Sequence, residues 1–322
     1  MKEAIKIIFL GTPDFAVDSL AALLQQGFNI SAVITAPDQP VGRGQVMQSS
    51  PVKKFAVQHG LKVLQPVKLK DPAFIQELSS FQADLFIIVA FRMLPEVVWQ
   101  MPRLGTFNLH ASLLPQYRGA APINHAIING ESETGLTTFF LKQEVDTGSI
   151  ILQEKMPVYP EDTAGTLHDR MKTAGAKLVL KTVEAILSGN LKTTEQSNLV
   201  NPSVTLKPAP KIFRSDCRID WKRSTDEIYN KVRGLCPYPA AYTYFTSPAG
   251  ESFLVKIYKT DKSAVKTNLQ PSVLVTDSKS DLAVSTSDGI LHIREIQQAG
   301  KRIMKTEEFL RGFRINSDWK VG

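Results

Sequence analysis

The chain has 322 residues, of which 43% are hydrophobic and 21% charged, an ordinary composition for a globular protein. No apolar run approaches the roughly 20 residues of a membrane-spanning helix. The opening MKEAIKIIFLGTPDF predicts a first strand and a turn rather than a signal peptide. With only Cys217 and Cys236, neither a disulfide framework nor a thiolate metal site is expected, which favours a cytoplasmic protein.

The net charge of +7 lies entirely in the last third of the chain. Residues 1–206 carry 18 Lys and Arg against 18 Asp and Glu, whereas residues 207–322 carry 20 against 13, an excess of 7. A basic module beside a neutral one suggests that the module holds a polyanionic partner. A basic surface that only confers solubility is the alternative, and charge alone does not decide between them.

The first half of the chain alternates between strand and helix patterns. Apolar runs predict strands at 4–10, 28–35, 61–65, 84–90 and 105–110, and apolar residues at helical spacing predict helices at 14–27, 50–60 and 71–81. This alternation predicts βαβ units, with a parallel sheet and right-handed crossovers.

The pattern changes after residue 131. Residues 133–143 and 148–158 predict an antiparallel pair of strands, and residues 163–190 predict a long helix. The following segment contains several prolines and no apolar periodicity, which is typical of a linker. We therefore divide the chain into a first domain at 1–190, a linker at 191–206 and a second domain at 207–322.

The second domain begins with a helix signal at 224–234, where Ser224 and Glu227 form a capping-box pattern. Short β-like runs follow, including AAYTYF, SFLVKIYK, LAVST and ILHIREIQ. Turn residues separate these runs at the spacing of a small β-barrel.

Asn108 and His110 share one face of the predicted strand GTFNLH, because side chains alternate along a strand. Polar residues are unwelcome inside a sheet covered on both faces, but the carboxyl end of a strand is where open α/β sheets bind ligands. A hydrogen-bonded core pair is the alternative. The nearby segments SLLP and RGAAP and the later VDTG favour a functional site.

Asp146, in EVDTG, is placed at the tip of the antiparallel connection. Asp before Thr-Gly is ordinary turn chemistry, so a catalytic role for Asp146 requires that it lie near His110 in space.

The segment GTPDFA follows the first strand, where a phosphate-binding loop would lie. It has neither the spacing of a dinucleotide fingerprint nor the Lys and Ser of a Walker motif, so we expect no nucleotide cofactor. No group of His, Cys, Asp or Glu has the spacing of metal ligands, so we expect no metal.

The segment 35–51 predicts a long polar loop with Arg43 between two glycines. Loops of this length are usually functional or disordered. An arginine on a glycine-flanked arm suits contact with phosphates or base edges, and simple solvent exposure is the alternative.

Several of these segments together resemble the 10-formyltetrahydrofolate-dependent formyltransferases. The resemblance is carried by FLGTPDFA, PDQPVGRG, SPVKKFA, MPRLGTFNLHASLLPQYRGAAPI and EVDTGSII, and it continues in KIFRSDCRIDWKRSTDEIYNKVRGLCPYPAAYT. The two-domain layout and the basic second domain look like the members that act on initiator methionyl-tRNA. The resemblance implies a Rossmann-like, mostly parallel first domain and a smaller OB-like β-barrel as the second.

The resemblance also implies site residues and partners. The catalytic Asn, His and Asp of the family fall on Asn108, His110 and Asp146. The folate co-substrate, 10-formyltetrahydrofolate, is expected at Ser112, Leu113, Leu114 and Pro115, together with Phe91, Arg92 and Met93. The tRNA is expected at Arg43, Lys207, Lys211, Arg214 and Arg223, with no membrane and no obligate protein partner.

Two positions depart from the family pattern. The loop after the fourth strand reads AFRMLP, one residue shorter than is common, with Arg92 in place of a glycine. Ala111 stands where glycine is frequent.

The expected reaction needs donors aimed at an oxyanion and a route for the proton of the attacking amine. Asn108 can donate through its amide and His110 through a ring N–H, while Asp146 can orient His110 or a water. Alternative functions are an amino-sugar nucleotide formyltransferase, a glycinamide ribonucleotide formyltransferase, a hydrolase that releases formate, and a non-catalytic RNA-binding protein.

Overall fold

The computed structural model of the protein describes residues 4–41, 45–201, 203–263 and 267–322. Contacts within the chain divide it into two compact units. Unit 1 comprises Met1–Gly119, Thr134–Met156 and His168–Pro208, and unit 2 comprises Ala120–Glu133, Pro157–Leu167 and Ala209–Gly322. Each unit collects three separate stretches of chain. The domain boundaries inferred from the sequence, 1–190, 191–206 and 207–322, stay a prediction.

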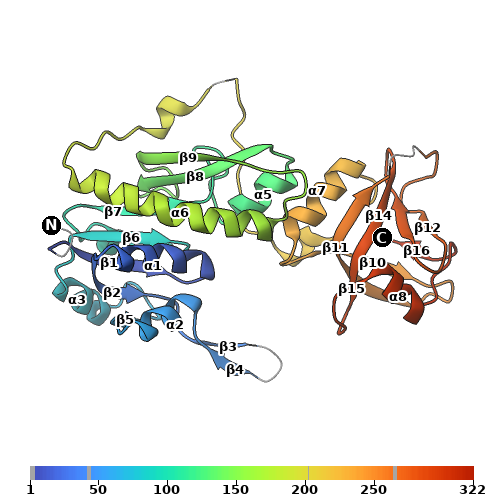
Figure 1. Ribbon diagram of the computed structural model, residues 1–322, viewed down its shortest axis with the longest axis horizontal. Helices are drawn as coiled ribbons and strands as arrows, with labels where there is room; N and C mark the ends of the chain where they lie inside the picture. Colours follow the sequence, from blue (N-terminus) through green and yellow to red (C-terminus); the bar gives the residue numbers. More distant parts are fainter. Residues whose placement is uncertain (1–3, 42–44, 202, 264–266) are drawn as a thin grey trace. The chain divides into compact units, whose positions relative to one another are not determined.

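Unit 1 is built on a seven-stranded sheet with the order β5-β2-β1-β6-β7-β8-β9 (Figure 1). The parallel part consists of β1 (Lys6–Gly11), β2 (Asn29–Ile34), β5 (Val63–Leu64), β6 (Leu85–Val89) and β7 (Thr106–His110). Next to it, β8 (Glu133–Phe140) runs antiparallel to β7, and β9 (Ile150–Pro157) lies at the edge. The predicted parallel sheet is confirmed, and its strand order reverses between β1 and β6, a place where such sheets bind ligands.

The helices of unit 1 begin where the sequence supplies caps. The Ser50 and Asp71 side chains accept from the backbone N–H of Lys53 and Ala73, with a proline at the first position of each helix. The elements are η1 (Asp14–Ala16), α1 (Val17–Gln25), α2 (Pro51–Gln58), α3 (Pro72–Ser80), α4 (Glu96–Trp99), α6 (Ala164–Leu187), which continues from unit 2, and η2 (Gln196–Leu199). All five residues of β6 are buried, as expected of a parallel strand covered on both faces.

The segment 35–51 differs from its prediction as an irregular loop. It contains a short antiparallel hairpin, β3 (Gln39–Val41) with β4 (Val46–Gln48). Strands of three residues are too short to produce an alternating pattern, and Pro40 hides the remaining strand signal. Arg43, the predicted tRNA contact, lies outside the described residues.

Unit 2 is a mostly antiparallel sheet with the order β12-β13-β14-β11-β10-β16. A bridge between Val273 and Lys320 joins the two ends, so the sheet nearly closes into a barrel. The predicted OB-like barrel is thus confirmed. Its strands are β10 (Ala241–Thr246), β11 (Ser252–Lys262), β12 (Leu274–Thr276), β13 (Leu282–Ser285), β14 (Ile290–Gln298), β15 (Met304–Lys305) and β16 (Lys320–Val321).

Unit 2 also contains helices, in addition to the strands of the barrel. α7 (Thr225–Leu235) starts with the predicted capping box, in which Ser224 and Glu227 bond each other's backbone N–H. α5 (Pro122–Ile128) packs closely on α7, where a Cβ added at Gly234 would lie 2.6 Å from Ile128 Cγ1. The remaining helices are η3 (Arg214–Cys217) and α8 (Thr306–Gly312).

The barrel core surrounds Trp221, whose side chain is almost fully buried. Its indole N–H donates to Thr243 Oγ1 at 3.0 Å, so the one polar atom of the ring is satisfied. In the described part of the chain, no helix combines the length and apolar character that a membrane span needs.

The β8–β9 connection has no room for a side chain at Gly148. A Cβ added there would lie 1.6 Å from Phe140 O, so Gly148→Ala must push the two strands apart. We expect the free energy of unfolding to fall by about 3 kcal/mol, the upper range for overpacking. Denaturant unfolding measures this, with Gly312→Ala as the control, because an added Cβ there meets nothing within 4 Å. Equal losses in the two variants would contradict the described approach of β8 and β9.

Candidate functional site

His110, the last residue of β7, has one ring nitrogen committed to the backbone. It is buried, and its Nε2 lies 2.9 Å from Tyr117 O. A carbonyl oxygen can only accept, so Nε2 carries the proton of this hydrogen bond. In the neutral ring Nδ1 therefore keeps its lone pair, and it faces Asp146 Oδ2 at 3.9 Å. The proximity that a catalytic role of Asp146 required is present.

Asp146 is held in the β8–β9 connection in a sparsely populated backbone conformation, with φ at +54°. Its Oδ2 accepts from Gly119 N–H at 3.0 Å, and only 13% of the side chain is exposed. The carboxylate is therefore oriented by a backbone donor and directed at the histidine.

Gln196 and Arg118 hold the connection that carries Asp146, and sequence reasoning missed both. Gln196 is 2% exposed, and its Nε2 donates to Asp146 O at 2.8 Å and to Gly148 O at 2.9 Å. Its Oε1 accepts from Arg118 Nε at 3.0 Å and Nη2 at 2.6 Å. Gln196 belongs to the segment predicted as a linker, where no apolar pattern marks a single buried glutamine.

Asn108 lies two residues before His110 on the same face of β7 and is half-buried. Among the residues that the structure describes, its amide has no hydrogen-bond partner. Its two N–H donors are therefore available to a ligand at the carboxyl end of the strand.

The segment SLLP, predicted to bind folate, is held by side chains from β8 and β9. Thr137 Oγ1 donates to Ser112 O at 2.6 Å and accepts from Leu114 N–H at 3.1 Å. Gln153 Nε2 donates to Leu114 O at 2.8 Å and to Thr137 Oγ1 at 2.9 Å. Ser112 is fully buried and bonds Gln116 O, so its hydroxyl is already used. Leu114 and Pro115 are also buried, and Leu113 is half-buried.

The second predicted folate segment, 91–93, is tied down by the residue that departs from the family pattern. The Arg92 guanidinium donates to Val67 O at 2.9 Å and to Pro66 O, and it lies 5.7 Å from the centre of the Phe91 ring. Partial burial lowers the pKa of Arg92. Arg92 thus links the loops that follow β5 and β6, while Met93 is 76% exposed.

The predicted tRNA residues that the structure describes belong to both units. Lys207 belongs to unit 1, where its backbone bonds Gln116 Oε1 and Tyr117 N–H. In unit 2, Arg223 lies 3.6 Å from carboxylates of both Asp220 and Glu227.

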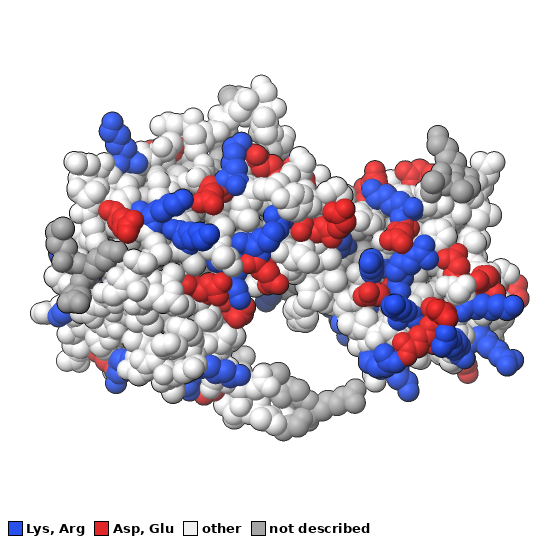
Figure 2. Space-filling model, in the orientation of Figure 1, with Lys and Arg blue, Asp and Glu red and all other residues white. Residues whose placement is uncertain are grey.

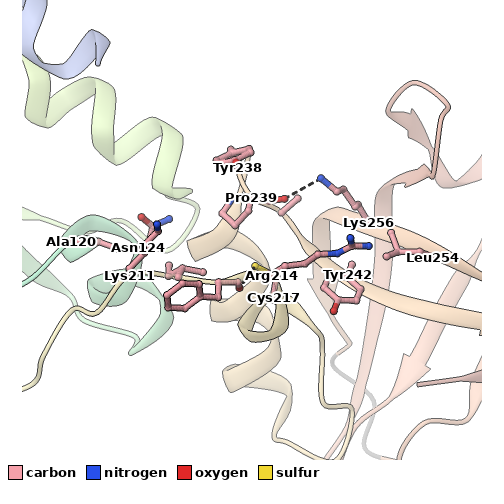
Figure 3. A pocket seen from close by; sticks show the side chains of 14 residues that line it. Ala120, Asn124, Lys211, Arg214, Cys217, Tyr238, Pro239, Tyr242, Leu254 and Lys256 are labelled. Carbon is pink, nitrogen blue, oxygen red and sulfur yellow. Dashed lines mark hydrogen bonds between the residues drawn. The ribbon is translucent and has the colours of Figure 1, made fainter. Parts of the chain in front are cut away.

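Lys211 and Arg214 are brought together in unit 2. Both are exposed and line a cavity of about 530 Å³ (Figure 3). On the face that Figure 2 shows, Lys and Arg side chains of the barrel lie among Asp and Glu side chains. Ion pairs of unit 2 include Arg294 Nε–Asp261 Oδ2 at 2.7 Å.

Metal ligation has no candidate in the described ranges, where no three His, Cys, Asp or Glu side chains are grouped to hold an ion.

Comparisons with known proteins agree on one family. A family model described as "Formyl transferase" matches residues 5–183, and one described as "Formyl transferase, C-terminal domain" matches residues 211–314. The methionyl-tRNA formyltransferase of Bacteroides fragilis is 51% identical over 99% of this chain and 98% of its own length. That of Parabacteroides distasonis is 52% identical over 100% of this chain and 99% of its own.

Solved structures share the fold. WlaRD, a sugar 3N-formyl transferase solved in the presence of dTDP and 5-N-formyl-THF, has a TM-score of 0.62 at 23% identity, covering 92% of this chain and 99% of its own. HypX from Aquifex aeolicus, in complex with tetrahydrofolic acid, has a TM-score of 0.62 at 18% identity, covering 94% of this chain and 46% of its own. With family models matching both parts of the sequence and relatives more than half identical along its length, the chain belongs to the formyl transferase family.

Proposed function

We propose that the protein transfers the formyl group of 10-formyltetrahydrofolate to the free α-amino group of methionine on initiator methionyl-tRNA. The observation that carries this proposal is the similarity to proteins named methionyl-tRNA formyltransferase, 51% to 52% identical over nearly the whole of both chains. The last third of the chain supports a nucleic-acid partner, since residues 207–322 hold the whole excess of positive charge.

The proposed reaction starts with attack of the amine on the formyl carbon, which places negative charge on the formyl oxygen. The amide of Asn108, which no described residue engages, donates to that oxygen. His110 Nδ1, which holds a lone pair because Nε2 donates to Tyr117 O, accepts the proton of the amine. Asp146, at 3.9 Å, faces the imidazolium that results. His110 returns the proton to the folate nitrogen as its bond to the formyl carbon breaks.

An amino-sugar nucleotide acceptor is the second candidate, because the WlaRD sugar formyl transferase shares the fold. The purified protein is supplied with 10-formyltetrahydrofolate and one of three acceptors: charged initiator tRNA, free methionine or an amino-sugar nucleotide. We expect formylation of the charged tRNA only. Formylation of the sugar nucleotide instead would overturn the proposal.

Replacing His110 or Asn108 by alanine removes one group that acts on the tetrahedral intermediate. We expect turnover to fall by roughly 10²–10³ in Asn108→Ala, the scale for loss of one oxyanion donor. In His110→Ala we expect a fall of roughly 10²–10⁴, the scale for loss of a general acid–base group. His59→Ala is the control, because His59 is exposed and stacks on Phe55. Steady-state kinetics on folded protein makes the measurement. Turnover near that of the unmodified protein in either variant removes that residue from the mechanism.

Thr137 provides a test of the folate segment that leaves the predicted ligand residues intact. Thr137→Val keeps the shape but leaves Ser112 O and Leu114 N–H without this partner, whereas Thr137→Ser keeps the hydroxyl. Leaving buried polar groups unpaired costs about 1–3 kcal/mol. We expect folate binding, measured by titration calorimetry, to weaken about tenfold in Thr137→Val and to stay unchanged in Thr137→Ser. Identical folate affinities in the two variants would show that the hydrogen bonds of Thr137 do not affect folate binding.

Arg43→Ala is expected to weaken formylation of tRNA far more than folate binding, because Arg43 is proposed to contact only the nucleic acid. The apparent KM for tRNA and the folate dissociation constant are the two readouts, with Lys54→Ala as the control. Equal losses in both readouts would assign the loop to the folate site or to folding.

A further inference from the structure

Unit 2 contains a cavity that the proposed reaction does not use. Its volume of about 530 Å³ falls in the range of roughly 300–1,000 Å³ of small-ligand sites. The lining comes from α5 and the two residues before it, the segment 211–217, the turn 238–240 and the strands β10 and β11 (Figure 3). All of these belong to unit 2.

The cavity is electropositive. Lys211, Arg214 and Lys256 line it, and no Asp or Glu is among the residues of its wall. Arg214 has no side-chain partner in the described part of the chain, and Lys256 Nζ donates to Pro239 O at 3.1 Å. The Asp216 carboxylate, two residues along the chain, accepts from Phe213 N–H at 2.8 Å, and within the described residues no ion pair joins it to Arg214. An anion is the ligand that this charge favours.

Aromatic rings line the same cavity as these cations. Phe213 is 59% exposed and Tyr238 is 82% exposed, both unusual for such large apolar side chains in a protein surface. Lys211 Nζ lies 5.6 Å from the centre of the Phe213 ring. Tyr242, on β10, adds a third ring to the wall. Rings beside cations are the arrangement that binds unpaired nucleotides, because every base offers a face for stacking.

We propose that this cavity binds an unpaired nucleotide of the tRNA, with its base stacked on Tyr238 or Phe213 and its phosphate at Arg214 and Lys211. This rests on the proposed tRNA substrate. A paired nucleotide does not fit the observation, since both faces of its base are covered by its neighbours in the duplex.

The dependence of tRNA binding on salt separates stacking from charge. Tyr238→Leu and Phe213→Leu are expected to weaken binding by about 5- to 100-fold at every salt concentration, without changing the slope of log affinity against log salt. Arg214→Ala is expected to lower that slope by about 1. The controls are Ile303→Ala and Lys279→Ala, an exposed apolar and an exposed basic residue outside the cavity wall.

Competition between tRNA and short RNAs tests whether the cavity binds an unpaired nucleotide. A single-stranded RNA hexamer is expected to displace tRNA from the unmodified protein but not from Tyr238→Leu, and a blunt RNA duplex of equal charge is expected to displace it equally from both. Unchanged tRNA binding in both leucine variants overturns the proposal, and so does saturation of the cavity by AMP without effect on tRNA. If the unmodified protein formylates no tRNA, the proposed function is wrong, and this result is distinct from the binding results that test the cavity.

A second inference concerns Gln196, which connects three segments around Asp146. Its amide must place Nε2 toward two carbonyl oxygens, and the two hydrogen bonds from Arg118 to Oε1 select that orientation. Arg118 also precedes Gly119, whose N–H bonds Asp146 Oδ2. The backbone and the carboxylate of Asp146 thus depend on the same neighbouring pair.

We infer that Gln196 is a positioning residue for Asp146 and that Arg118 sets the orientation of Gln196. This rests on the proposed part of Asp146 in the reaction. In Gln196→Glu the contact with Arg118 remains possible, but an oxygen replaces the donor that faces Asp146 O and Gly148 O. We expect kcat to fall by up to about 100-fold, the cost of displacing a reacting group by about 1 Å, with KM for folate and tRNA within twofold.

Three measurements complete this test. Gln100→Glu is the control, because Gln100 is exposed. Added guanidinium is expected to restore part of the kcat lost in Arg118→Ala, and the losses of Arg118→Ala and Gln196→Glu are expected to be less than additive in the double variant. A matching fall in folate affinity and thermal stability, without rescue, would reduce Gln196 to a structural role. An unchanged kcat in Gln196→Glu would overturn the inference, while activity on a different acceptor would bear only on the proposed function.

Discussion

The candidate site depends on one constraint: each polar group that it buries must find a partner inside the protein. His110 meets it through Tyr117 O, Asp146 through Gly119 N–H, and Gln196 through Arg118 and two carbonyls. An unpaired buried group costs about 1–3 kcal/mol, so these partners fix the side chains in one arrangement. Among the residues that the structure describes, the half-buried Asn108 amide has no partner, and it lies where the proposed oxyanion forms.

A second constraint, close packing, explains the glycine that ends β1. GTPDFA stands where a phosphate loop would, yet a Cβ at Gly11 would lie 2.7 Å from Ala16 Cβ. This glycine therefore permits the close packing of η1 on β1, which is a requirement of the fold and needs no phosphate.

The sequence predicts those parts of the molecule whose chemistry is local. Alternation along β7 puts Asn108 and His110 on one face, and the capping box marks the start of α7. The hairpin β3–β4 and the helix α8 were not predicted, because elements of three or seven residues leave little periodicity. The pairing of His110 with Asp146 spans a whole helix and strand of intervening chain, and Gln196 is one polar residue among many. Such contacts depend on the tertiary structure and cannot be predicted from local sequence patterns.

Because each unit is built from non-contiguous stretches of chain, a hybrid of two related proteins cannot be made by joining them at a single point. Unit 2 takes α5 from residues 120–133 and a further stretch from 157–167, and α5 covers the close-packed side of α7 at Gly234. A fragment that starts at Ala209 would leave that side of α7 bare, and a fragment that ends there would keep α5 without its support. Exchanging the barrel between two relatives by a single crossover would therefore mismatch α5 and α7. A working hybrid has to inherit three stretches of chain from the same parent.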